Sequence, residues 1–141
     1  MKTRFLPLLL GVTAACLLAG CATSHDAGPY LSQPSRTPPL ENTEPFVLLD
    51  PGVQFSVNCP GINVRQLEDG RLEILAQLRN RENRRIEVQA NCVFKDLNGF
   101  AVGDATPFET VILTENATEQ VRFVSANDTA KTYTIRVRQA R

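Results

Sequence analysis

The sequence predicts an all-β protein, built as one antiparallel β-sandwich of six or seven strands. From residue 46 onward, hydrophobic and polar side chains alternate with a period of two, which is typical of strands that bury one face and expose the other. Short segments rich in Asn, Asp and Gly separate the alternating runs, and these residues tolerate the backbone angles of tight turns. No segment keeps a sustained helical spacing of hydrophobic residues, so strands are expected to supply the core.

The alternation is clearest along 86–94, where Val88, Cys92 and Phe94 share one face and Asn91 lies on the opposite face. We therefore expect Cys92 to point into the core, between the two sheets. Several strands at this spacing, separated by turn signals, favour a sandwich. The remaining alternating runs are 53–57, 72–78, 111–113, 121–123 and 133–137.

The first twenty residues predict a signal peptide. Lys2 and Arg4 make the start basic, and fourteen almost wholly apolar residues follow at 5–18. That run is shorter than the stretch of about twenty residues that crosses a bilayer as a helix. A basic start, a short apolar middle and a small-residue end are typical of secretion signals.

The signal peptide ends in Leu18-Ala19-Gly20-Cys21, which resembles the lipobox of bacterial lipoproteins. The resemblance implies cleavage before Cys21 and attachment of lipid to its thiol, so that the membrane is the protein's first partner. The alternative is an ordinary signal peptide cut nearby, with Cys21 left as a plain thiol. No aspartate follows Cys21, and this favours the periplasmic face of the outer membrane.

A proline-rich tether is predicted at 21–45, between the lipidated cysteine and the folded domain at 46–141. The stretch holds five prolines among small polar residues. Such a composition buries too little apolar surface to offset the entropy of ordering. Prolines keep the chain semi-extended, so we expect a spacer that holds the domain away from the membrane.

Cys59 and Cys92 are expected to form a disulfide. They are the two cysteines left once Cys16 is discarded with the signal peptide and Cys21 takes lipid, and pairing is the default in an oxidising compartment. Closing a loop of this length stabilises a fold by about 3–4 kcal/mol. One alternative is a pair of metal ligands, but no third ligand lies nearby in the sequence. The other is a reactive thiol, but the sequence has no Cys-x-x-Cys motif.

The segment Leu78-Arg79-Asn80, the strand to Phe94 and the turn Lys95-Asp96-Leu97-Asn98-Gly99 resemble the YcfL-like family of small lipoproteins. The resemblance covers about residues 70–138 and the lipobox. It implies an immunoglobulin-like sandwich on the periplasmic face of the outer membrane, without an established activity. Some relatives are encoded near lipoprotein activators of peptidoglycan synthases.

The composition argues against an enzyme. The single histidine, His25, falls in the tether, so the folded domain lacks the base of a Ser/His/Asp or Cys/His arrangement. Asp96, Asn98 and Asp104 lack the ligand string of a calcium loop, and we expect no metal or cofactor. Losing two of the 15 basic residues with the signal peptide leaves 13 against 15 acidic ones, which excludes a nucleic-acid partner.

Four arginines, Arg79, Arg81, Arg84 and Arg85, cluster at a predicted hairpin tip. Guanidinium groups bind carboxylates and phosphates through two parallel hydrogen bonds, so the cluster is a candidate contact for an anionic partner. The alternative is a solvated turn that resists aggregation. The patch would grow if the last strand brought its own arginines alongside, at positions 136, 138 and 141.

The function we expect is a non-enzymatic binding or scaffold module in the cell envelope. Its partner would be an envelope protein or a cell-wall component, which the domain reaches from its membrane tether. The alternatives are a peptidoglycan-binding or peptidoglycan-synthase accessory factor, and an accessory lipoprotein of a secretion machine.

Overall fold

The computed structural model describes residues 32, 34 and 39–141. The residues from 39 onward belong to one compact unit, Thr37–Arg141. The predicted signal peptide and the lipidation site at Cys21 lie outside the described residues. Within the described ranges, no helix is long and apolar enough to cross a membrane.

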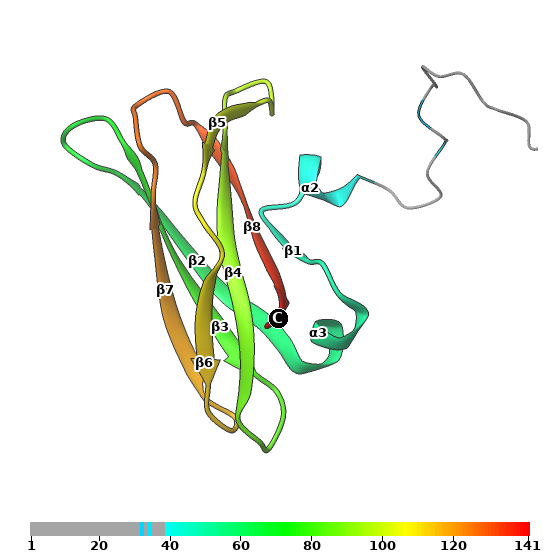
Figure 1. Cartoon of the computed structure of the whole chain (residues 1–141). Coiled ribbons are helices and arrows are strands. Elements are labelled where there is room, and N and C mark those ends of the chain that lie inside the picture. The colour runs from blue at the N-terminus through cyan, green and yellow to red at the C-terminus, as the bar shows by residue number, and fades with distance from the viewer. Residues whose placement is uncertain (1–31, 33, 35–38) are drawn as a thin grey trace, which may run out of the picture. The chain divides into compact units, whose positions relative to one another are not determined.

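In the part of the chain that the structure describes, eight strands form two sheets that face each other (Figure 1). One sheet has the order β1-β8-β4-β5, with β6 also paired to β4, and the other has the order β2-β3-β7. Every pair is antiparallel except β1 with β8. The prediction of an all-β sandwich is confirmed, with eight strands among the described residues in place of the six or seven expected. The elements are α2 (Leu40–Thr43), β1 (Phe46–Leu48), α3 (Pro51–Ser56), β2 (Val57–Gln66), β3 (Leu72–Asn80), β4 (Ile86–Lys95), β5 (Ala101–Ala105), β6 (Glu109–Leu113), β7 (Thr118–Val124) and β8 (Thr132–Gln139).

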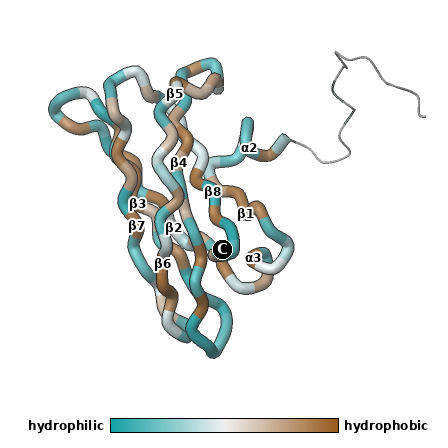
Figure 2. Tube along the Cα trace, in the orientation of Figure 1, coloured by the Kyte–Doolittle hydropathy of each residue, from teal (hydrophilic) through white to brown (hydrophobic). Residues whose placement is uncertain are grey.

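The core lies between the sheets, where the inward faces of β3, β4 and β8 meet. The predicted face of β4 is confirmed, since Val88, Cys92 and Phe94 are all buried. Figure 2 shows hydrophobic residues recurring along the strands between hydrophilic ones, whereas the β3–β4 loop is hydrophilic. Burying this much apolar surface is the main favourable term in folding.

The prediction of a strand over residues 53–57 is wrong, because most of these residues form the helix α3. Proline suits the first helical position, since its fixed φ matches the helix and its missing N–H has no partner there. Val53 and Val57 lie four residues apart and are both buried, so one helical turn explains their spacing as well as a strand does. Phe55, halfway between them, points outward.

Three strands, β1, β2 and β5, have no counterpart in the predicted runs. Near its start, after Val57, β2 contains Asn58-Cys59-Pro60-Gly61, a sequence that is typical of a turn. The structure accommodates this stretch by a register shift between Asn58 and Gly61, and β2 is an edge strand, where proline is tolerated. β5 contains Gly103 at a φ of +74°, a conformation that glycine adopts at little cost.

Residues 40–45, which the sequence assigns to the tether, lie against the sandwich. The ammonium group of Lys95 donates to the carbonyl oxygen of Glu41. The hydroxyl of Thr134 donates to the carbonyl of Glu44 at 2.8 Å. These bonds satisfy carbonyls of the short helix α2 and fix it to β4 and β8, so the folded part begins before residue 46.

Candidate functional site

The predicted disulfide between Cys59 and Cys92 is not formed, and both residues are free thiols. Cys92 is fully buried on β4, whereas Cys59 lies on β2 in the opposite sheet, at the register shift. The thiol of Cys59 instead approaches the carbonyl of Gly61 on its own strand, at 3.5 Å.

The two thiols are expected to differ in reactivity. Burial raises the pKa of Cys92 to about 12 and raises the pKa of the half-buried Cys59 as well. Because the thiolate is the reactive form, alkylation of the folded protein at pH 8 should modify Cys59 faster, by about tenfold or more. Mass spectrometry after timed iodoacetamide treatment measures this, and a bond between the two cysteines before treatment would contradict it.

Asn80 organises the loop between β3 and β4, where the predicted arginine cluster lies. Its side chain is fully buried and donates to the carbonyls of Arg84 at 2.7 Å, Leu113 at 3.3 Å and Thr114 at 2.8 Å. Its oxygen accepts from the backbone N–H of Glu82 at 2.9 Å. One amide therefore joins the β3–β4 loop to the end of β6.

The structure brings only two of the four arginines, Arg84 and Arg85, to one place. Together with α3 they line a hollow of about 370 Å³, and α3 and the loop lie at the same end of the sandwich (Figure 1). Arg79 instead lies on β3 opposite Thr118 of β7, in the other sheet. Arg81 is exposed in the loop, where its N–H donates to the carbonyl of Ser56 at 2.8 Å.

The charges in this hollow offset one another. Arg84 pairs with Glu82, and Arg85 pairs with Glu87 at 2.8 Å. The hydroxyl of Ser56 and then the guanidinium of Arg84 lower the pKa of Glu82, so this acid is ionised at neutral pH. The hollow therefore presents alternating charges, which suits a polar protein surface better than a strongly anionic polymer.

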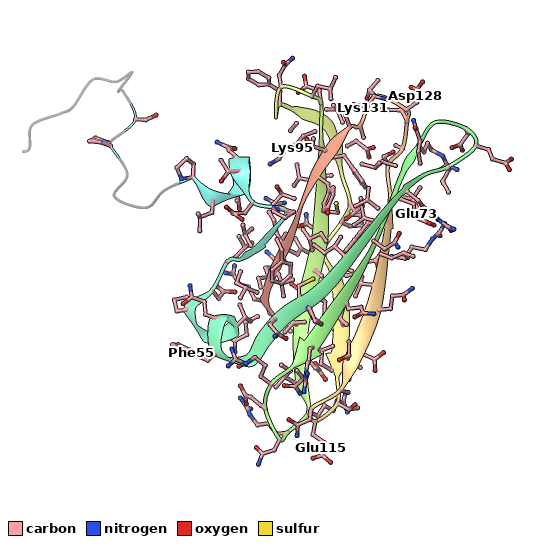
Figure 3. All side chains as sticks on the ribbon, turned by 180° about the vertical axis from the view of Figure 1, so that it is seen from behind. Phe55, Glu73, Lys95, Glu115, Asp128 and Lys131 are labelled. Carbon is pink, nitrogen blue, oxygen red and sulfur yellow. The ribbon has the colours of Figure 1, made fainter. Side chains whose placement is uncertain are left out.

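Phe55 gives the hollow an apolar rim. Its side chain is 77% exposed on α3 and lines the same hollow as Arg84 and Arg85. In Figure 3 it lies at the same end of the sandwich as Glu115 and away from Lys95. Sequence reasoning missed this residue because it placed Phe55 on the buried face of a strand.

A buried carboxylate, Glu73, lies on the outer face of the β2-β3-β7 sheet. Its side chain is fully covered and pairs with Arg65 of β2 on one side and Arg122 of β7 on the other. Hydrogen bonds from Arg65 first, and then from Arg122, lower the pKa of Glu73 below its usual value. The three side chains join all three strands of this sheet.

Changing Glu73 to Gln should flatten the acid dependence of stability. A carboxylate with a lowered pKa stabilises the fold above its unfolded pKa, and this contribution is lost as the pH falls through its folded pKa. The free energy of unfolding of the Glu73→Gln variant should therefore fall less than that of the wild type below pH 4.5. Urea unfolding at pH 7, 5, 4 and 3 measures this, with the exposed turn variant Glu115→Gln as control. Equal pH slopes for wild type and Glu73→Gln would contradict the assignment.

A second arginine pair, Arg136 and Arg138, lies on the outer face of β8. Both guanidinium groups lie over the ring of Phe108, at 5.5 Å and 3.8 Å from its centre. Each Nε donates to an amide oxygen of β4, Arg136 to Asn91 at 3.0 Å and Arg138 to Gln89 at 2.9 Å. In the sequence, the alternation of arginines along 133–138 indicates an exposed face. No local pattern around Phe108 indicates that its ring lies beneath these arginines.

The described part of the chain shows no cluster of metal ligands. Within it, no group of three or more His, Cys, Asp or Glu residues is placed to hold a metal ion. Every buried side-chain nitrogen and oxygen atom described has a hydrogen-bond partner, so none points unpaired into a cavity.

Comparison with known proteins gives a family and a fold. The family described as "Protein of unknown function (DUF1425)" matches residues 53–139. A crystal structure of a member of that family from Shewanella sp. pv-4 has a TM-score of 0.54 and 23% identity, over 60% of this chain and 79% of that chain. The crystal structure of Campylobacter jejuni cj0090 has a TM-score of 0.57 and 13% identity, over 68% of this chain and 98% of that chain. None of the curated proteins matches the chain at a significant level.

Proposed function

Because this chain belongs to the DUF1425 family, a family described as of unknown function, we propose its role from its own residues. We propose that it is a non-enzymatic docking module held in the cell envelope. Its partner is an envelope protein with a polar surface, and it is bound at the end of the sandwich formed by α3 and the β3–β4 loop. The observation that carries the proposal is the exposure of Phe55 beside Arg84 and Arg85.

The composition of the hollow supports a protein partner. Aromatic and arginine side chains supply most of the binding energy at protein interfaces, because they bury a large area and also form hydrogen bonds. Burying the ring of Phe55 alone would contribute about 1.5–3 kcal/mol. The paired charges of the rim, including Arg84 with Glu82, would then select a partner with complementary charges.

The lipobox and the tether supply the location. A lipid on Cys21 places the protein on a membrane, and the absence of an aspartate after it favours the periplasmic face of the outer membrane. This is the layout of the YcfL-like lipoproteins that the sequence resembles. From Cys21 to Pro39 an extended chain spans at most about 60 Å at about 3.3 Å per residue, which bounds the reach of the domain.

Lipidation is tested by changing Cys21 to Ser in the full chain. Cells fed a labelled fatty acid should incorporate label into the wild-type protein, and incorporation should fall to background in the variant because the acceptor thiol is gone. The variant should also leave the membrane fraction. Labelling that persists in Cys21→Ser would contradict the anchor, and the Cys59→Ser variant is the matched control.

Docking is tested by crosslinking intact cells, purifying the tagged full-length protein and comparing variants. Phe55→Ala removes an exposed ring without opening a core cavity, so the fold should persist while the crosslinked partner is lost. Phe100→Ala removes another exposed ring, in the β4–β5 turn, and should retain the partner. Equal recovery of the partner from both variants would count against the α3 surface.

A second candidate, recognition of cell-wall glycan, is favoured by the outer face of the β2-β3-β7 sheet. A hollow of about 420 Å³ there is lined by Asn63, Gln77 and Gln120 around Leu75. Amide side chains donate and accept hydrogen bonds, as sugar hydroxyls require. Co-sedimentation with purified peptidoglycan tests this, and binding that survives the change of Gln77 and Gln120 to Ala would reject the hollow as its site.

A further inference from the structure

The outer face of the β4–β8 strand pair carries three cations in a row. Arg138 lies opposite Gln89, and Arg136 lies opposite Asn91. Farther along β4, Lys95 is only 6% exposed. We call this surface, Arg138, Arg136 and Lys95, the β4–β8 cationic face, and it is distinct from the hollow at α3.

The two guanidinium groups of the cationic face are fixed in orientation. Each uses its Nε in a hydrogen bond to an amide oxygen of β4, and each lies over the ring of Phe108. Among the described residues, the terminal amino groups of Arg136 and Arg138 form no hydrogen bond, and the one carboxylate near them is that of Glu41, 4.0 Å from Arg136. The side chains lose little further freedom when they bind a ligand. Pairs of terminal nitrogens in this geometry suit the two oxygens of a carboxylate.

A small hollow joins Arg136 to Lys95. It has a volume of about 170 Å³ and is also lined by Glu41 and Thr134. The ammonium group of Lys95 has two hydrogen-bond partners, the carbonyl of Glu41 and the hydroxyl of Thr134 at 2.7 Å, so one of its three protons remains available.

The ion pairs of the described residues leave this face positively charged. Among the described residues, Glu41 is the one carboxylate within ion-pair distance of any of the three cations, at 4.0 Å from Arg136, and its side chain is half exposed. Neither Arg138 nor Lys95 has a carboxylate partner in the described part of the chain. A buried lysine without a counter-ion is costly, so an incoming anion would be stabilised beside Lys95.

We propose that the cationic face binds an acidic peptide segment in extended conformation, with acids at alternate positions. One carboxylate enters the hollow between Arg136 and Lys95 and displaces the side chain of Glu41. The next carboxylate on the same side of the peptide pairs with Arg138. Residues two apart on a strand are separated by about 6.8 Å, so the two arginines and two alternate acids of an extended peptide have the same spacing.

The proposal is tested by fluorescence anisotropy with the full-length chain and a labelled peptide of alternating aspartate and threonine. Binding should be lost, by about tenfold or more in Kd, in the Arg136→Gln/Arg138→Gln variant, and should be retained in Arg79→Gln, an exposed arginine of the other sheet. Tenfold corresponds to about 1.4 kcal/mol. Glu41→Gln should bind more tightly than the wild type, because it removes the competing carboxylate.

Other outcomes would overturn the proposal. The first is that a peptide with asparagine in place of each aspartate binds with the same Kd. The second is that the wild type and the Arg136→Gln/Arg138→Gln variant bind the acidic peptide with the same Kd. The third is that Glu41→Gln binds the acidic peptide more weakly than the wild type. Inorganic phosphate and phosphatidylglycerol vesicles are tested in parallel, and binding of either in place of the peptide would also reject it. Thermal unfolding of each variant shows that a loss of binding is not a loss of fold. The docking test at Phe55 uses different residues, so either surface can fail alone.

Discussion

Replacing Asn80 by Ala is expected to destabilise the fold by about 3 kcal/mol, because it leaves buried groups without partners. Three carbonyls, those of Arg84, Leu113 and Thr114, lose their donor, and the N–H of Glu82 loses its acceptor. Each buried group left unpaired costs about 1–3 kcal/mol unless water reaches it. The expected loss of stability is smaller than the sum of these separate costs, because water can reach the groups at the loop end of the network.

Urea unfolding of the wild type and of Asn80→Ala measures this effect. The matched control is Asn83→Ala, since Asn83 is an exposed residue of the same loop, and its change should stay within about 0.5 kcal/mol of the wild type. If Asn80→Ala is as stable as this control, the loop is not held by the amide network.

Replacing Phe94 by Ala is expected to cost about 3–5 kcal/mol, the largest effect of any single change discussed. Phe94 is fully buried on β4, the strand that pairs with β5, β6 and β8. Truncation leaves a cavity that the three neighbouring strands prevent from closing. The loss in stability therefore includes both the transfer free energy of the removed ring and the cost of the cavity. For a domain of this size, Tm should fall by about 15 °C or more.

Thermal unfolding followed by circular dichroism measures the fall in Tm. The control is Phe100→Ala, which removes the same side chain from an exposed position in the next turn and should leave Tm nearly unchanged. A loss of less than about 1 kcal/mol for Phe94→Ala would mean that the β4 face does not form the core.

The sequence predicts the sandwich and its central strand because these depend on local periodicity. Along 86–94 the alternation of side chains matches the burial of β4, since a strand sends successive residues to opposite faces. The same rule explains why Arg79 and Arg84 do not lie together. Arg79 is still in β3 and faces outward from the other sheet, whereas Arg84 lies beyond Asn80 in the loop.

The rest depends on contacts between residues far apart in the chain. Val53 and Val57 fit a strand or a helical turn equally well, and only tertiary packing decides between them. Asn80 bonds to Thr114, which is 34 residues away, and Phe108 meets Arg138 across β4. The disulfide was predicted from the compartment and the cysteine count, and neither of these fixes where Cys59 and Cys92 lie in the fold, where both are free thiols.

The central claim, docking through α3 and the β3–β4 loop, is tested most directly by a photoreactive amino acid at position 55 in living cells. Irradiation should give one discrete product of higher mass, and reversing two charges by Arg84→Glu and Arg85→Glu should abolish it. The same probe at position 97, where Leu97 is 81% exposed in the β4–β5 turn, should not give that product. No product from position 55, or the same product from both positions, would contradict the claim.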